Sequence, residues 1–196
     1  MFVQVIEGRT KDAAALLEAG DRWQQEVRPG AIGYLGVTAG VTADGRTVAI
    51  VRFEDEASAR ANAERPEQTA WFEGMAKLYD GEPTFTESSD VTEWMGGGSD
   101  DAGFVQVMKS TGVDRVQLEK MDAAFESFVD QRPDLLGGLR IWTGPDSCID
   151  VAYFTTEEDA RKGEQAEVPD ALKDLMSEFD GMGETQYFDL TDPQLR

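Results

Sequence analysis

The residues with the clearest potential for chemistry are an arginine and an aspartate that each interrupt an apolar, strand-like run. Arg52 does so in the first half of the sequence and Asp150 in the second. A charged group in such a run is costly unless it is paired, reaches water or faces a ligand. Arg52 is therefore a candidate for binding an anionic ligand, with pairing to Glu54 or access to solvent as the favoured alternative. Asp150 is a candidate base with a raised pKa, and pairing with Arg52 or Arg140 is an equal alternative.

These residues belong to a wider set of candidates for a pocket between a sheet and its helices. In the first half the set is Trp23, Tyr34, Arg52, Trp71 and Phe72. In the second half it is Trp142, Asp150 and Tyr153, with Tyr153 in the place of Arg52. Core packing is the stronger alternative for the aromatic members, since they fall on apolar faces. Because the two halves differ at these positions, we expect at most one half to keep a ligand site.

The sequence contains no histidine, which excludes most of the common catalytic and metal-binding devices. Ser-His-Asp and Cys-His catalysis and His-ligated haem, zinc and non-haem iron all require one. Cys148 is the one cysteine, so an internal disulfide is excluded, and we interpret it as an inert buried side chain. Acidic runs at 54–56 and 157–159 are interpreted as helix caps rather than cation sites. We predict no metal and no cofactor.

The charge balance limits the classes of partner. Lys and Arg number 18 against 39 Asp and Glu, a net charge of -21. Such a charge repels phosphate backbones and anionic lipids, so we expect neither a nucleic-acid nor a membrane partner. The sequence shows no secretory signal and no apolar stretch long enough to span a bilayer. We therefore expect a globular cytoplasmic protein whose partner is a small molecule.

A repeated motif organises the chain. Phe2-Val3-Gln4-Val5 recurs as Phe104-Val105-Gln106-Val107, and later landmarks such as Arg28-Pro29 and Arg132-Pro133 match in the same order. This self-similarity predicts one α+β unit written twice. We predict a first repeat over residues 1–94, a Gly-rich linker over 95–103 and a second repeat over 104–196.

Each repeat is predicted to contain elements in the order β-α-β-β-α-β. In the first repeat we expect strands over 2–6, 32–42, 47–53 and 84–87, with helices over 11–27, from 55 to 63 and from 66 to 78. In the second we expect strands over 104–108, 136–143, 148–154 and 184–190, a helix capped by Asp114, and a Thr155–Glu158 capping box that opens another. Pro169 is expected to restart that helix and Asp180-Gly181 to end it.

The strand patterns carry apolar residues on both faces, whereas two helices cover one face. The bare face must therefore be buried against something, and the other repeat is the nearest partner. We predict an intrachain pseudo-dimer in which two antiparallel sheets face each other as an α/β barrel with the helices outside. A further homodimer is left open.

The sequence resembles the dimeric α/β-barrel superfamily of ferredoxin-like folds, in a tandem form. Within this superfamily it is most similar to the antibiotic-biosynthesis-monooxygenase-type domains. The resemblance lies in residues 2–5, in the strand-to-helix junction at 51–60 and in 65–72; the stretch from Arg52 to Phe72 is similar to proteins of high-GC soil bacteria. The haem-degrading relatives depend on a histidine that is missing here. The cofactor-free oxygenases hold a phenolic substrate with Trp, Tyr, Asn and Arg, but Asn62, the one asparagine, is expected at a helix start. No complete catalytic motif carries over.

Three classes of function remain compatible with the sequence. The leading hypothesis is a pocket-bearing, monooxygenase-like protein, with a cofactor-independent oxygenase on an aromatic or polyketide-like substrate as its enzymatic form. The second is a small-molecule binder without catalysis, and the third is a structural or oligomerisation domain without a pocket. A cavity with a convergent polar group favours the first, an apolar cavity the second, and a filled core the third.

Overall fold

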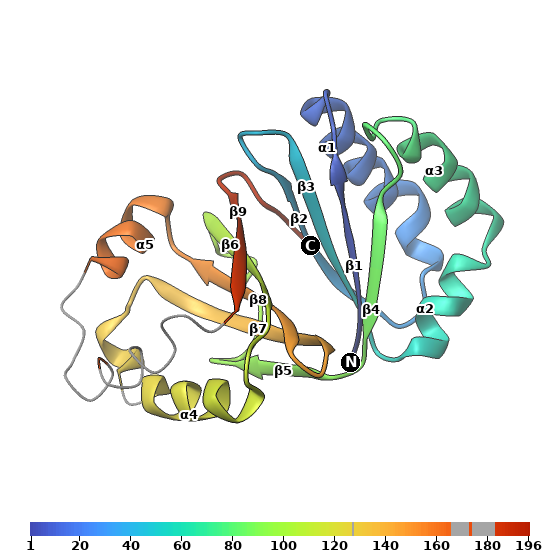
Figure 1. Ribbon diagram of the computed structural model, residues 1–196. Coiled ribbons are helices and arrows are strands. Elements are labelled where there is room, and N and C mark those ends of the chain that lie inside the picture. Colours follow the sequence, from blue (N-terminus) through green and yellow to red (C-terminus); the bar gives the residue numbers. More distant parts are fainter. Residues whose placement is uncertain (127, 166–172, 174–182) are drawn as a thin grey trace. The chain divides into compact units, whose positions relative to one another are not determined.

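The computed structural model describes residues 1–126, 128–165, 173 and 183–196, in two compact units. The first unit is Met1–Val91 together with Leu190–Arg196, and the second is Thr92–Asp189. Each contains an antiparallel five-stranded sheet with helices (Figure 1), so the predicted α+β class is confirmed. The predictions at Pro169 and Asp180-Gly181 lie outside the described residues.

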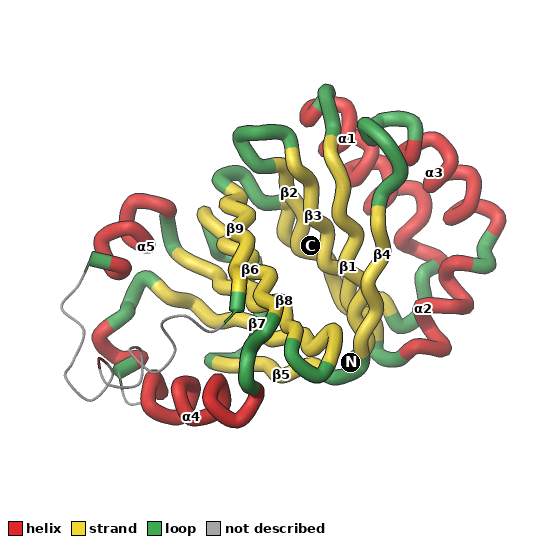
Figure 2. Tube along the Cα trace, viewed as in Figure 1, coloured by secondary structure: helices red, strands yellow, loops and turns green. Residues whose placement is uncertain are grey.

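The sheet of the first unit has the strand order β10-β2-β3-β1-β4. Its strands are β1 (Phe2–Arg9), β2 (Tyr34–Val41), β3 (Arg46–Phe53), β4 (Thr84–Ser88) and β10 (Gln194–Leu195). Its α-helices are α1 (Ala13–Arg22), α2 (Glu56–Ala63) and α3 (Pro66–Ala76), which all lie on one face of the sheet (Figure 2). This leaves a layer between sheet and helices in which a site can form.

Local sequence signals determine where these helices begin. The side chain of Asp12 accepts a hydrogen bond from the amide of Ala15, and Asp55 does the same for Ser58, so each caps a free helix N-terminus. Pro66 is the first residue of α3, where its missing N–H costs nothing. The helix predicted over 11–27 ends its α-helical part at Arg22 and continues as a π-helix over Trp23–Val27.

The second unit repeats this plan with the strand order β5-β7-β8-β6-β9. Its strands are β5 (Val91–Trp94), β6 (Phe104–Thr111), β7 (Leu135–Gly144), β8 (Ser147–Phe154) and β9 (Glu184–Leu190). Its described helices include α4 (Arg115–Glu126) and α5 (Glu157–Glu164). The predicted capping box is one residue out of place: Thr156, not Thr155, caps α5 by accepting from the amide of Asp159.

The edge strands depart from the simple order of the sequence. β5 precedes the Gly-rich stretch but is a neighbour of β7, and β10 follows all elements of the second repeat but pairs with β2. Each unit therefore contains the predicted β-α-β-β-α-β order plus one further edge strand. The pairing of β10 is what brings the segment Leu190–Arg196 into the first unit.

Strand alternation divides the first sheet into two different faces. On the face turned toward the helices, Ile6 pairs with Ala49 and Gln4 with Val51. On the other face lie Val3, Val5 and Ile50, whose side chains are all buried. These four helix-facing residues are only partly buried, which indicates open space between them and the helices.

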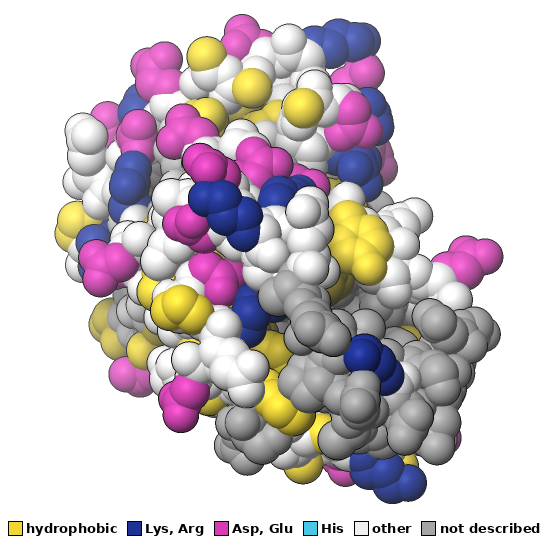
Figure 3. Space-filling view, turned by 90° about the vertical axis from the view of Figure 1, so that its left-hand side faces the viewer, with side chains coloured by type: hydrophobic (Ala, Val, Ile, Leu, Met, Phe, Trp, Pro, Cys, Tyr) yellow, Lys and Arg dark blue, Asp and Glu magenta, His cyan; other side chains and the backbone are white. Residues whose placement is uncertain are grey.

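The acidic residues on one face of the molecule are spread out rather than clustered. On the face shown in Figure 3, Asp and Glu side chains are scattered and Lys and Arg lie among them. Many are held in local ion pairs, such as Glu56 with Arg60 along α2 and Glu158 with Lys162 along α5. Surface pairs of this kind contribute little to stability. The excess negative charge therefore marks no single patch on this face.

Candidate functional site

A cavity of about 350 Å³ lies between the sheet and the helices of the first unit. Its sheet side is formed by small and β-branched residues that include Val37, Ala39, Ala49 and Val51. A volume of this size suits a small organic molecule. The sequence predicts a pocket between sheet and helices, and the cavity lies there.

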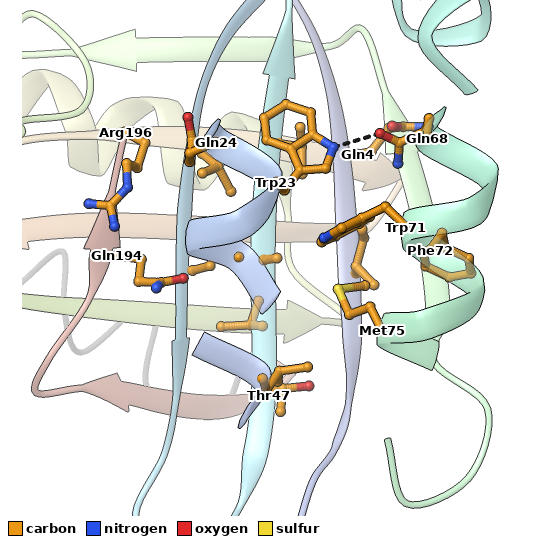
Figure 4. Close-up of a pocket in the computed structure, with 18 of the residues that line it drawn as sticks. Gln4, Trp23, Gln24, Thr47, Gln68, Trp71, Phe72, Met75, Gln194 and Arg196 are labelled. Atoms are coloured by element: carbon orange, nitrogen blue, oxygen red, sulfur yellow. Dashed lines mark hydrogen bonds between the residues drawn. The ribbon is translucent and has the colours of Figure 1, made fainter. Parts of the chain in front are cut away.

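The helix side of the cavity comes from α1, α3 and the π-helix between α1 and β2. Leu16, Leu17 and Gly20 line it from α1. The π-helix contributes Trp23 and Gln24, which lie side by side in Figure 4. Single turns of π-helix occur often at functional sites, because they redirect side chains that an α-helix would place elsewhere.

Four aromatic residues that line the cavity form a connected cluster of rings: Trp23, Tyr34, Phe53 and Trp71. The ring of Trp23 lies 4.8 Å from that of Tyr34 and 6.2 Å from that of Trp71, and Tyr34 lies 5.9 Å from Phe53. The contacts are tilted or edge-to-face, which is the favourable geometry for aromatic pairs. Rigid aromatic walls of this type suit a flat, apolar ligand.

Hydrogen bonds fix the orientation of both indole rings. Trp23 donates from Nε1 to Oε1 of Gln68 at 2.6 Å, and this bond is drawn in Figure 4. Trp71 donates from Nε1 to the backbone carbonyl of Ala19 at 2.9 Å. The indole nitrogens are therefore satisfied by the protein, and the rings act as walls rather than as polar contacts for a ligand.

A polar pair adjoins the aromatic cluster. Nε2 of Gln24 donates to the phenolic oxygen of Tyr34 at 3.0 Å, while Oε1 of Gln24 is buried without a hydrogen-bond partner. Burial raises the pKa of Tyr34, against opposing effects of Gln24 and three arginines. The phenol therefore stays protonated at neutral pH and keeps a hydrogen to donate. This pair therefore brings a hydrogen-bond donor and an unpaired acceptor to the lining of the cavity.

The segment Leu190–Arg196 supplies one wall of the cavity. Gln194 and Arg196 line it, on the side opposite Phe72 in Figure 4. Two backbone hydrogen bonds between Arg196 and Val37, of 2.7 and 3.1 Å, hold this segment on β2. The side chain of Arg196 is paired with Asp21 of α1. A residue late in the sequence thus helps to close the gap between β2 and α1.

The structure brings four predicted site residues together: Trp23, Tyr34, Trp71 and Phe72 all line this cavity. Arg52 is absent from the lining; it pairs with Val3 in β1, on the face away from the helices. Its Nε is buried without a hydrogen-bond partner.

In the second unit, Trp142 and Asp150 lie on one face of the sheet and Tyr153 lies on the other. Asp150 forms an ion pair with Arg140 at 2.7 Å, one of the two structural alternatives considered for it. Burial raises the pKa of Asp150, and the guanidinium of Arg140 opposes this rise. Trp142 lies beneath the guanidinium of Arg115 and packs with Cys148, and Tyr153 is fully buried.

Several residues of the lining were not predicted from sequence. Among the polar ones are Gln24, Asn62, Gln68, Gln194 and Arg196. Asn62 was expected at a helix start, away from the pocket, but it is buried in α2 and its Oδ1 accepts from Arg65. The apolar neighbours of Asn62 at helical spacing were the available signal for its inward position.

The described part of the chain contains no cluster of three or more residues suited to hold a metal ion. Within that same part, no helix has the length and apolar character required to cross a bilayer.

Comparison with known proteins gives a consistent fold. No family model and no curated protein matches the sequence. Among solved structures, one described as a putative monooxygenase from Fusobacterium nucleatum matches with a TM-score of 0.74 at 12% identity, over 100% of this chain and 93% of the other. The chain has the fold of the monooxygenase-like proteins.

Two further structures with this monooxygenase-like fold also match along the whole chain. A protein described as a putative monooxygenase from Lactobacillus acidophilus NCFM has a TM-score of 0.69 at 13% identity, covering 100% of this chain and 99% of the other. A protein described as anthrone oxidase-like has a TM-score of 0.63 at 10% identity, covering 100% and 92%. The likeness therefore extends over both units of the chain, and identities this low establish the fold alone.

Proposed function

We propose that this protein binds a flat, apolar small molecule in the cavity of its first unit and oxidises it with molecular oxygen, without a cofactor. The observation that carries the proposal is the aromatic lining by Trp23, Tyr34, Trp71 and Phe72 around about 350 Å³ of space. The substrate class is aromatic or polyketide-like. The match to an anthrone oxidase-like structure supports this class.

The chemistry asked of the protein is modest if the substrate itself is electron-rich. An anthrone-type substrate donates electrons to oxygen; one oxygen atom enters the product as a carbonyl, and the other leaves as water together with the two hydrogens of the substrate's methylene carbon. The role of the chain is to hold the substrate, exclude water and orient its polar group. Tyr34, held by Gln24 and protonated at neutral pH, is suited to hydrogen-bond the substrate oxygen.

Binding without catalysis is the second candidate. The polar atoms of the two indoles are already engaged within the protein, and the cavity lining is mostly apolar. Such a lining serves a carrier as well as an enzyme. The two candidates share the ligand class and differ in whether oxygen is consumed.

The test combines binding and turnover. Titration with 1-naphthol, followed by the tryptophan fluorescence to which Trp23 and Trp71 of the cavity contribute, measures binding, and an oxygen electrode with anthrone measures turnover. Tyr34→Phe is expected to lower oxygen uptake by about tenfold, because it removes one hydrogen bond to the transition state. Gln25→Ala, an exposed residue of the same π-helix, is the matched control. Quenching without oxygen uptake would favour the carrier, and absence of both would refute the proposal.

A further inference from the structure

Three residues with little or no side chain make the central space of the first unit. Ala39 of β2 lies directly opposite Ala49 of β3, on the helix-facing side of the sheet. Gly20 of α1 lines the same cavity from the helix side. A longer side chain at Ala39 or Ala49 would extend into the cavity, and a Cβ at Gly20 would stand 2.6 Å from Oε1 of Gln194, which also lines the cavity.

The second unit has three charged residues at the equivalent positions. Arg140 of β7 lies opposite Asp150 of β8, as Ala39 lies opposite Ala49. Asp150 also pairs with Met108 of β6, and Ala49 pairs in the same register with Ile6 of β1. On the helix, Asp122 follows the capping residue Asp114 by the same interval as Gly20 follows Asp12. Gly20, Ala39 and Ala49 thus correspond to Asp122, Arg140 and Asp150.

These three charged residues are bonded to one another across the layer between sheet and helix. Nε of Arg140 donates to Oδ1 of Asp150 at 2.7 Å, and Nη1 of Arg140 donates to Asp122 on α4. The side chains of Arg140 and Asp150 are 11% and 13% exposed, so this part of the bridge lies inside the unit, while Asp122 reaches its surface. Leu118, Trp142 and Cys148 pack together in the same layer.

We propose that this exchange of three residues confines ligand binding to the first unit, so that one chain binds one ligand. The inference deepens the proposed function, because it concerns the same cavity. Gly20, Ala39 and Ala49 determine the space available to the ligand, and the Asp122–Arg140–Asp150 bridge occupies the corresponding space in the second unit.

The energetics favour a bridge that stays closed. Displacing Arg140 from Asp150 would leave a buried charge without its partner, which is strongly unfavourable. An apolar ligand offers no group that compensates for that loss. The second unit therefore discriminates against the ligand through a charge pair rather than through size alone.

Xenon provides a test that does not depend on the natural ligand, because it enters apolar cavities of sufficient size. Under xenon pressure, methyl resonances of Ala39, Ala49 and Leu17 are expected to shift in NMR spectra, while that of Leu118 is expected to stay in place. Shifts in both units, or in neither, would overturn the inference. Shifts in the first unit without binding of 1-naphthol would leave the inference intact and refute the proposed function.

Exchange of the residues gives the second arm. The variant Gly20→Asp/Ala39→Arg/Ala49→Asp is expected to lose the xenon shifts and to weaken 1-naphthol binding at least about tenfold, a change of about 1.4 kcal/mol. Because three charges can prevent folding, Ala39→Leu fills the same space without charge and is expected to act in the same direction. Thermal unfolding confirms that each variant is folded. Unchanged shifts and affinity in a folded Ala39→Leu variant would contradict the assignment.

Discussion

Gln194 donates a hydrogen bond from Nε2 to the backbone carbonyl of Leu17 at 2.9 Å, so a residue of β10 is fixed to the first helix of the chain. The same amide lies 3.3 Å from Oδ1 of Asp21. β10 is only two residues long, and its side chains therefore have to supply much of its attachment. This connection keeps one wall of the cavity in place.

The first prediction concerns this wall. Gln194→Ala removes the bond to Leu17 and is expected to weaken 1-naphthol binding about fivefold, in line with about 1 kcal/mol for one hydrogen bond. Hydrogen exchange at the amide of Val37, which donates to Arg196, is expected to accelerate. Gln25→Ala is the surface control. If affinity and exchange both match the wild type, Gln194 has no part in closing the cavity.

The second prediction uses two glycines inside helices. A Cβ at Gly20 would stand 2.6 Å from Oε1 of Gln194, whereas a Cβ at Gly74 in α3 would meet nothing within 4 Å. Gly74→Ala is therefore expected to raise the free energy of unfolding by about 0.5–1 kcal/mol, the usual helix preference for alanine. Gly20→Ala is expected to raise the free energy of unfolding by less than Gly74→Ala does, or to lower it. Denaturant unfolding provides the measurement.

A double-mutant cycle separates the contact from the helix preference. In the Gln194→Ala background, Gly20→Ala is expected to recover the gain seen at Gly74, because the obstructing amide is gone. Equal effects of Gly20→Ala in both backgrounds would show that the contact with Gln194 carries no energy.

Sequence patterns predicted the parts of the fold that depend on local signals. The recurrence of Phe2-Val3-Gln4-Val5 predicted two similar units, and the apolar helix faces placed Trp23 and Trp71 toward the sheet, where they line the cavity. The alternation of side chains along β3 could also have predicted the position of Arg52. Its neighbour Val51 lines the cavity, so the side chain of Arg52 belongs to the opposite face of the sheet.

Other parts depend on contacts that have no local signal. The pairing of Gln194 and Leu195 with Ala39 and Thr38 joins segments that are far apart in the sequence, and two residues carry no strand pattern. The π-helix at Trp23–Val27 was likewise not distinguishable from the helix before it. Both features position cavity residues, so the lining was predicted only in part.

The third prediction concerns the stability of the Arg140–Asp150 pair. Asp150→Asn leaves the guanidinium with Asp122 as its remaining charged partner and is expected to destabilise the protein by about 3 kcal/mol, the lower end for breaking a buried pair. The side chain of Asp122 is 54% exposed, so Asp122→Asn is expected to lower the free energy of unfolding by less than about 1 kcal/mol. Arg140→Leu/Asp150→Leu is expected to cost less than Asp150→Asn. Denaturant unfolding measures both losses of stability. A greater loss for the double variant than for Asp150→Asn would contradict the view that each charge is needed mainly to neutralise the other.

The fourth prediction concerns the reactivity of Cys148. Burial, reinforced by the nearby Asp150, raises the pKa of this thiol from 9.0 to about 12. The thiolate is the reactive form, so the folded protein is expected to be inert to a disulfide reagent such as 5,5′-dithiobis(2-nitrobenzoate) at pH 8, and to react once unfolded in guanidinium chloride. Rapid reaction of the folded protein would show that Cys148 is exposed or activated.

The same shift has a consequence for alkaline stability. Between pH 9 and about 12 the unfolded chain loses the thiol proton while the folded chain keeps it, so the unfolded state binds fewer protons and the free energy of unfolding falls as pH rises. Cys148→Ala lacks this titration. Its stability, measured by denaturant unfolding at a series of pH values, is therefore expected to fall less steeply than that of the wild type above pH 9. Parallel curves for the two proteins would mean that the thiol has the same pKa in both states, and that the burial of Cys148 beside Asp150 does not control its ionisation.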